Sequence, residues 1–210
     1  MDKTIEIIEN VKKSYKPNLI RIYLNCEKTT ASYSEAIKIS KNDLNVFKDL
    51  LNKNKLSEIK IFTENFSINE EKDSYKDKDG LIKYKTIGFT FNQSLRLDID
   101  FDSDLLGLLL DLISKSNIGY TLSLSFDLKD KETYQEELYL EALKKAKNRA
   151  EISAETLGVK LKELVNVEHE NLIQSSNRVM PLRAARNDDF SLNANDIVLM
   201  DRVKTVYSFE

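Results

Sequence analysis

Glycine and proline are scarce in this chain of 210 residues, which contains only five glycines and two prolines. Phosphate-binding loops need closely spaced glycines, because their backbone must approach the ligand without an intervening side chain. No two glycines of this chain have the spacing of GxGxxG or of a P-loop; they are Gly80, Gly88, Gly107, Gly119 and Gly158. The sequence therefore excludes dinucleotide sites and P-loop nucleotide sites of the usual kind.

Cysteine and histidine each occur once, as Cys26 and His169. A single cysteine allows no disulfide within the chain, which suits a reducing compartment. One cysteine and one histidine do not supply the ligands of a usual structural zinc site. The pair could in principle act as nucleophile and base. However, the pattern places Cys26 on an apolar strand face as an inert thiol, and no third group to orient the histidine is evident. We expect no catalytic residue, no metal and no cofactor.

Long apolar runs and an excess of positive charge are also missing. The longest apolar run, Leu105 to Ile113, is too short to span a bilayer, and the N-terminal MDKTIEIIENVKKSY lacks the apolar core of a signal peptide. The 32 basic residues minus the 35 acidic ones leave a net charge of −3, whereas nucleic-acid binders carry a basic excess. We therefore expect a cytoplasmic protein with no membrane span and no nucleic-acid partner.

Hydrophobic residues make up 41% of the chain, enough for a sizeable core. Alternating residues predict strands, and a period near 3.6 predicts helices. The expected strands are 4–11, 19–30, 59–68, 87–101, 121–128, 164–169 and 197–209, and the expected helices are 34–54, 103–115 and 131–157. In the clearest strand, 87–101, odd positions are apolar and even positions polar; Gln93 is the one exception and predicts a bulge there.

This order predicts an α+β fold with two lobes of mostly antiparallel sheet packed by helices, ββαβ and then βαβαββ. The charged segment Asn69–Gly80 is typical of a solvated hairpin loop, and it is also the candidate boundary between the lobes. We expect an N-terminal lobe at residues 1–75 and a C-terminal lobe at 81–210, which can also form one continuous unit.

Small residues recur every four positions on the longest predicted helix, at Ala142, Ala146, Ala150 and Ala154. On a helical wheel they fall in one sector with Tyr139, Leu143 and Leu157, and charged side chains lie opposite. This sector carries no ionisable side chain. We therefore predict that the stripe packs closely against a sheet, with Leu157 filling one end of the contact, and that Gly158 ends the helix.

Four stretches of the chain resemble the SIMPL-domain family of YggE-like bacterial proteins. They are TTASYSEAIKISKNDLNVFKDLLNKNKLSEIKIFTENFSI, GFTFNQSLRLDIDFDSDLLGLLLDLISKSNIGYTLSLSF, EALKKAKNRAEISAETLGVKLKELVNV and NDIVLMDRVKTVYSF. The resemblance implies a two-lobed α+β fold and a tendency to assemble, and it brings no established catalytic residues. It also implies a loose link to envelope and stress biology, where many members are exported.

Three charged groups are candidate sites with competing interpretations. DIDFDSD, Asp98 to Asp104, begins like a calcium loop, but the sixth and twelfth positions hold Ser103 and Leu109, which favours a wet strand face leading into a helix cap at Asp102 or Ser103. Lys144 to Arg149 alternates with glutamates and indicates a solvated helix face. The third group lies in a long loop predicted around Pro181 and provides either solubility or a contact to phosphate or an acidic partner; these candidate partner-binding residues are Arg178, Arg183 and Arg186.

Three functions remain open on this evidence. The first is a non-enzymatic SIMPL-like protein that forms a homo-oligomer or binds a protein partner, in a stress- or envelope-related role. The second is an enzyme that uses two carboxylates with separated pKa values, in a site between the lobes. The third is a signalling adaptor that binds a peptide by strand addition at a free sheet edge.

Overall fold

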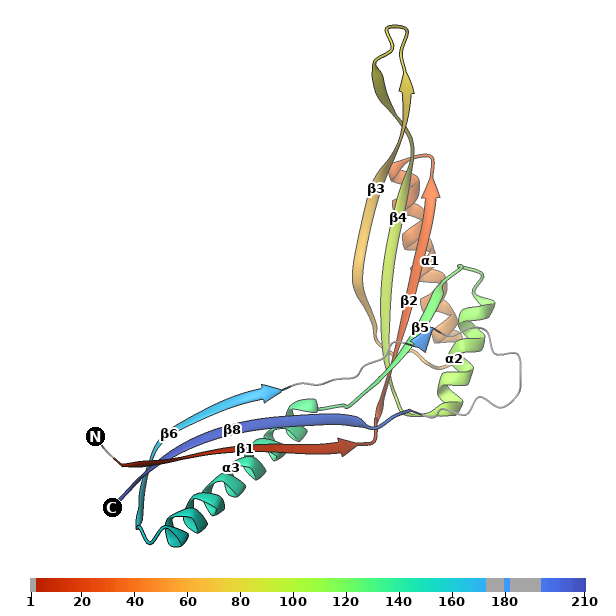
Figure 1. Ribbon diagram of the computed structural model, residues 1–210. Helices are drawn as coiled ribbons and strands as arrows, with labels where there is room; N and C mark the ends of the chain where they lie inside the picture. Colours follow the sequence, from red (N-terminus) through yellow and green to blue (C-terminus); the bar gives the residue numbers. More distant parts are fainter. Residues whose placement is uncertain (1–2, 173–179, 182–193) are drawn as a thin grey trace. The chain divides into compact units, whose positions relative to one another are not determined.

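The computed structural model describes residues 3–172, 180–181 and 194–210. They form an α+β fold with two antiparallel sheets, as the sequence predicts, and they divide into two compact units (Figure 1). We call residues 19–126 and 180–181 the central unit, and residues 3–18, 127–172 and 194–210 the terminal unit.

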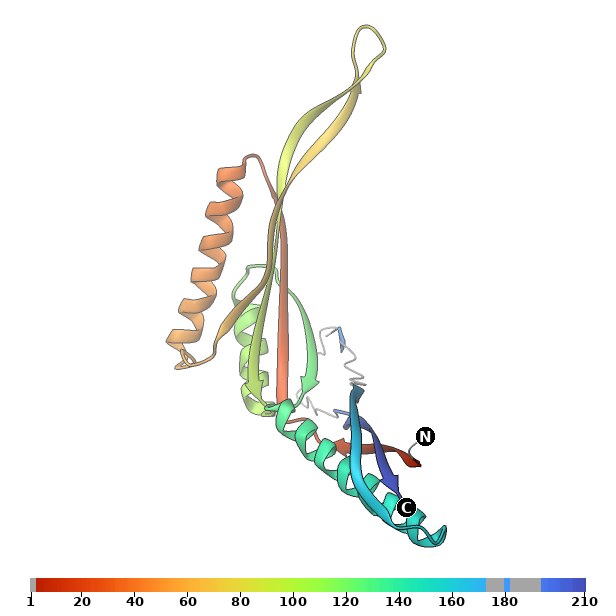
Figure 2. The ribbon, with the colours of Figure 1, turned by 90° about the vertical axis from the view of Figure 1, so that its left-hand side faces the viewer.

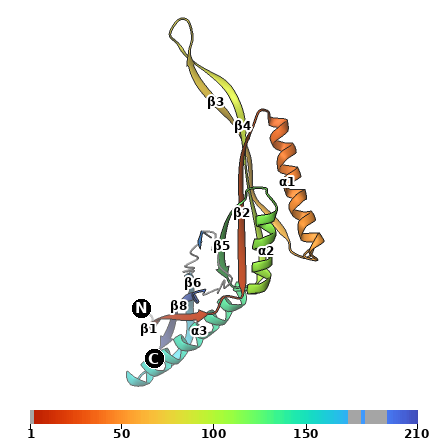
Figure 3. The same cartoon turned by 90° about the vertical axis from the view of Figure 1, so that its right-hand side faces the viewer.

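The central unit is a sheet with the strand order β3-β4-β2-β5-β7 and with two helices, α1 and α2, on one face (Figures 2 and 3). Its elements are β2 (Leu19–Thr30), α1 (Tyr33–Lys53), β3 (Ile61–Lys76), β4 (Ile82–Asp100), α2 (Ser103–Lys115), β5 (Thr121–Asp127) and β7 (Met180–Pro181). One face of β2 and β4 packs against the helices, and the fully buried centre of this core includes Ile22, Leu24, Phe47, Phe91, Leu97 and Leu109.

The predicted alternation of buried and more exposed residues in β4 is confirmed from Phe91 to Ile99. The prediction of a bulge at Gln93 is wrong. Gln93 is 6% exposed and pairs in register with Cys26 on β2 and with Phe66 on β3. A bulge there would have turned the following apolar residues of β4 to the solvent face. The register shifts fall instead around Glu64 in β3 and Ile87 in β4.

Side chains cap the starts of α1 and α2, and the cap of α2 was predicted. Asp102 caps α2, because its side chain accepts hydrogen bonds from the amides of Asp104 and Leu105 at 2.9 and 3.1 Å. Ser32 caps α1 and accepts from the Glu35 amide at 3.2 Å, while the Glu35 carboxylate accepts from the Ala31 amide. These two bonds resemble a capping box, with Glu35 three residues after the cap, but its carboxylate bonds the amide of Ala31 rather than that of Ser32.

The charged segment Asn69–Gly80 is a hairpin, as predicted, but most of it is strand rather than loop. β3 continues to Lys76 and β4 begins at Ile82, so that the connection is only residues 77–81. Ile87 was expected on the buried face of β4 and is 64% exposed, which makes that part of the prediction wrong. The reason is that β2 ends at Thr30, opposite Phe89, and leaves the start of β4 without a core to face.

Gly88 lies close to the backbone at the end of β2. A Cβ atom placed on Gly88 would lie 2.9 Å from the carbonyl oxygen of Thr30. Backbone atoms yield less readily than flexible side chains, so we predict that Gly88→Ala lowers the free energy of unfolding by about 1–3 kcal/mol. Urea denaturation measures this, with Gly107→Ala as the control, because a Cβ at that helical position meets nothing within 4 Å. Equal or higher stability of Gly88→Ala would contradict the close approach.

The terminal unit is a three-stranded sheet of order β1-β8-β6 with α3 along one face. Its elements are β1 (Thr4–Tyr15), α3 (Lys131–Thr156), β6 (Leu161–Leu172) and β8 (Ile197–Phe209). The alanine stripe of α3 packs against this sheet, as predicted: Ala142, Ala146 and Ala150 are fully buried. Leu157, by contrast, is 67% exposed and does not fill the end of the contact. It follows the last helical residue, and Gly158, at φ +66°, turns the chain there.

These units differ from the expected division at residues 75–81. Residues 77–81 connect two strands of one sheet inside the central unit, and β1 pairs along its whole length with β8, at the other end of the chain. A charged hairpin turn has the same composition as a linker, and the pairing of distant strands leaves no local signal in the sequence.

Candidate functional site

The feature of the central unit that most resembles a binding surface is a two-stranded arm. We define the arm as residues 69–88, which comprise the end of β3, the turn 77–81 and the start of β4. Figure 1 shows it projecting past the ends of β2 and α1. A two-stranded ribbon without a third strand or a helix has no face on which to bury apolar side chains.

The arm nevertheless carries large apolar side chains on both of its faces. Each of them is at least half exposed: Tyr75 50%, Leu81 62%, Ile82 64%, Tyr84 70% and Ile87 64%. The register places Ile82 and Tyr84 on one face of the ribbon and Tyr75 on the other, while Leu81 lies in the turn. Single exposed apolar residues are ordinary, but several gathered on one short hairpin indicate a candidate interaction site.

Hydrogen bonds fix the arm as an ordered hairpin. In its turn, the Asp77 carboxylate accepts from the amides of Asp79 and Leu81 at 2.9 and 3.0 Å and pairs with Lys83 at 2.7 Å. The hydrogen bond from Lys83 and the bond from the Leu81 amide lower the pKa of Asp77. Gly80 completes the turn at φ +79°, a conformation that suits glycine.

A second contact braces the arm nearer to the sheet. The Thr86 hydroxyl donates to the Glu70 carboxylate, which also pairs with Lys72 at 2.9 Å. These two donors, the hydroxyl first, lower the pKa of Glu70. The arm is thus held in its shape before any partner binds, which reduces the entropy lost on binding.

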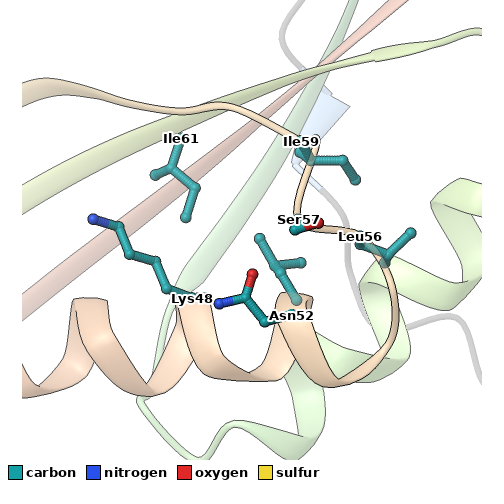
Figure 4. A pocket seen from close by; sticks show the side chains of 7 residues that line it. Lys48, Asn52, Leu56, Ser57, Ile59 and Ile61 are labelled. Carbon is teal, nitrogen blue, oxygen red and sulfur yellow. The ribbon is translucent and has the colours of Figure 1, made fainter.

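A shallow groove of about 190 Å³ lies elsewhere in the central unit, where α1 meets the segment leading into β3 (Figure 4). Leu51, Leu56, Ile59 and Ile61 supply apolar walls, while Lys48, Asn52 and Ser57 supply polar groups. In Figure 4 the Asn52 amide points from α1 toward the segment that carries Ser57. The groove is smaller than most small-molecule sites.

In the terminal unit, polar side chains interrupt the core beneath the alanine stripe. Glu9, Asp201 and Thr205 are 7%, 1% and 0% exposed. Glu9 and Thr205 lie between the two apolar clusters that α3 covers, and Asp201 lies within one of them, between Leu199 and Val203. His169, 37% exposed, makes a 2.9 Å hydrogen bond from Nε2 to Asp201 Oδ2, and its ring stacks on Tyr139 at 4.3 Å. We call Glu9, His169, Asp201 and Thr205 the polar seam.

The ionic contacts of the polar seam differ between its two sides. On β1, the Glu9 carboxylate lies 2.7 Å from the Arg149 guanidinium. On β8, the Oδ1 atom of Asp201 and the hydroxyl of Thr205 are buried without a hydrogen-bond partner among the described residues. Neither Glu9 nor Asp201 lines the groove on α1 or the second shallow groove, which runs between α3 and β1.

That second groove is bordered by charge. Its lining consists of Lys13, Glu137, Leu140, Glu141 and Lys144. Glu141 pairs with Lys13 and, at 2.9 Å, with Lys145, and these two contacts, that with Lys13 first, lower the pKa of Glu141 to about 2. The exposed lysines and glutamates of α3 thus pair with one another and with β1, as the predicted solvated face requires.

The candidate residues from the sequence fall in different parts of the chain. Arg178, Arg183 and Arg186 lie outside the described residues. Cys26 belongs to the central unit and is 3% exposed, and burial raises the pKa of its thiol; His169 belongs to the terminal unit. In the DIDFDSD stretch, Asp98 lies 3.0 Å from Arg96, and Asp102 caps α2.

Two features were missed by the sequence interpretation. The first is the arm: the sequence interpretation placed Tyr75 in a solvated loop and Ile87 on a buried strand face, and it assigned Ile82 and Tyr84 to no element. The second is the polar seam, which alternation could have revealed: Asp201 and Thr205 occupy the same odd face as Leu199 and Val203, and Glu9 follows Ile7 on the inner face of β1. The inward position of Asp201 could therefore have been predicted from the sequence. Its hydrogen bond to His169 could not.

The described part of the chain contains neither a cluster of metal ligands nor a helix that could span a membrane. Residues 3–172, 180–181 and 194–210 contain no group of three or more His, Cys, Asp or Glu side chains able to hold a metal ion. Across the same ranges, none of the helices has the length and apolar character needed to cross a membrane.

Comparison with known proteins identifies the family. The model of the SIMPL family, a protein of unknown function (DUF541), matches residues 5–207, nearly the whole chain. No curated protein matches the sequence. The match spans both units, including the arm and the polar seam. The chain therefore belongs to the SIMPL family.

Proposed function

We propose that this protein acts without catalysis, by binding copies of itself through the arm. The observation that carries the proposal is the group of five exposed apolar side chains on an ordered two-stranded ribbon. A ribbon of this kind gains stability when a third strand or another apolar surface covers it. A second copy supplies the same ribbon and is always present at the same concentration.

The energetics set what such a contact can achieve. Full burial of a large apolar side chain contributes about 1.5–3 kcal/mol, and these five side chains are between half and 70% exposed. Covering them contributes roughly 5–9 kcal/mol on that scale. Association costs about 4–15 kcal/mol in lost freedom. A single arm contact is therefore close to balance, and a stable assembly needs main-chain pairing or several contacts as well.

Light scattering coupled to size-exclusion chromatography tests this function. We expect the wild-type mass to exceed that of the 24.3 kDa monomer and to rise with protein concentration, because each arm contact is weak alone. A mass that stays at one copy across the whole accessible concentration range would contradict the proposal.

The same free strand edges also favour a second candidate function, the capture of an extended peptide by strand addition. β3 is a 16-residue strand at the edge of its sheet, as a peptide-binding adaptor requires. Its many charges, Glu64, Glu70, Glu71 and Asp73 among them, are the devices that discourage indiscriminate pairing. Unchanged mass of the purified wild type, together with a peptide that co-purifies with it, would favour this function over self-assembly.

A further inference from the structure

We propose that arms of successive copies pair head to tail, with the β4 edge of one arm hydrogen-bonded to the β3 edge of the next. This inference rests on the proposed self-assembly and adds its geometry and its partner surface. It follows from three properties of the arm, which are its free backbone edges, the charges along each edge, and the register already present within the hairpin.

The arm has two free backbone edges of matching length. β2 ends opposite Phe89, so residues 82–88 of β4 pair only with β3 among the described strands. On the other side, β3 is the outermost strand, so residues 69–76 pair only with β4. Seven residues on one edge and eight on the other can form a continuous ladder when the edges of two copies meet.

The charges distinguish the possible pairings. The β4 edge carries Lys83 and Lys85 and no acidic residue, whereas the β3 edge carries Glu70, Glu71 and Asp73 with Lys72 and Lys76. Like charges directly opposite each other destabilise a ladder, and opposite charges stabilise it. A symmetric β4–β4 contact would place four lysines on one short ladder. A β4–β3 contact places the lysines beside the acidic strand.

The hairpin itself shows that the side chains of β3 and β4 can lie opposite one another in an antiparallel ladder. Within one arm, Lys85 lies opposite Asp73 and Tyr84 opposite Ser74. If the next copy continues the sheet in the same register, each Lys85 lies between two Asp73 carboxylates, one from each side. The exposed Tyr84 and Ile82 of one arm then gain neighbours from the adjacent arm on the same face.

Head-to-tail contact joins two different surfaces and therefore does not stop at a dimer. Each added copy leaves one β4 edge and one β3 edge free, so the assembly grows until it closes into a ring or continues as a filament. A symmetric contact would instead saturate at two copies. The proposal thus predicts assemblies larger than a dimer.

Disulfide trapping between two variants tests the geometry. Ser74→Cys is co-expressed in turn with Tyr84→Cys, Ile82→Cys and Thr86→Cys, which cover the hairpin register and its shifts by two residues. The assembled protein is oxidised and analysed on a non-reducing gel. We expect linked dimers in at least one mixture, and none when any variant is oxidised alone, because two identical positions on alternate strands lie roughly 9–10 Å apart, beyond disulfide reach.

Wild-type protein is the matched control, since its only cysteine is Cys26, buried at 3% exposure and slow to react. Linked dimers from a single variant alone would overturn the head-to-tail pairing in favour of a symmetric one. Wild-type assembly without links in any mixture would also overturn it, yet leave the proposed self-assembly standing. A wild type that remains a monomer by light scattering would overturn both.

Discussion

Replacing Ile82 and Ile87 with aspartate is expected to convert the assembly to monomers. Both side chains are 64% exposed on the arm, so the substitution removes little from the folded monomer. In the head-to-tail assembly, however, the aspartates would replace the apolar contacts to the adjoining arm and would lie beside its acidic β3 edge, where like charges destabilise the ladder. We expect the dissociation constant to rise at least a hundredfold, as measured by sedimentation velocity over a range of concentrations.

The control for this experiment is Ile152→Asp. Ile152 is 54% exposed on α3 in the terminal unit, far along the chain from the arm, and the change has the same chemistry. We expect this variant to assemble like the wild type. If both variants dissociate equally, the effect is one of net charge; if neither dissociates, the arm is not the contact.

Replacing His169 with alanine is expected to destabilise the terminal unit strongly. Asp201 is 1% exposed, its Oδ2 atom bonds to His169 Nε2 at 2.9 Å, and its Oδ1 atom has no partner among the described residues. The variant would leave a buried carboxylate without that hydrogen bond. Leaving a buried acceptor without its hydrogen bond costs about 1–3 kcal/mol, and this loss of unfolding free energy is measurable by urea denaturation.

Two further variants separate this effect from a general weakening of β6. Asn166→Ala lies on the same strand and removes only an exposed contact to Glu168, so we expect a change below about 0.5 kcal/mol. The double variant His169→Ala with Asp201→Val removes the carboxylate as well and should recover most of the lost stability. Equal stability of His169→Ala and the wild type would mean that Asp201 does not depend on the histidine.

The parts of the fold that alternation and helical period control were predictable from the sequence. The strand Leu19–Thr30, the final strand Ile197–Phe209 and the alanine stripe appear as expected, because in each case one face is apolar and the other polar. The position of Gly158 after the long helix also followed from local chemistry.

The arm was less predictable, because its exposure depends on the absence of a neighbouring strand beside residues 82–88 of β4. Ile82, Tyr84 and Ile87 have the composition of an ordinary strand, and only the end of β2 at Thr30 leaves them uncovered. The polar seam has a local signal in the odd-face positions of Asp201 and Thr205. Its pairing with His169 on β6, in contrast, depends on a strand register that no local pattern specifies.

The most direct test of arm-mediated self-assembly is hydrogen–deuterium exchange of the backbone amides of residues 82–88. Exchange is measured on the wild type at a concentration where it is assembled and again after dilution to the monomer. The account predicts slower exchange of these amides in the assembled sample, with unchanged exchange in α3. Equal exchange rates of residues 82–88 at both concentrations would contradict it.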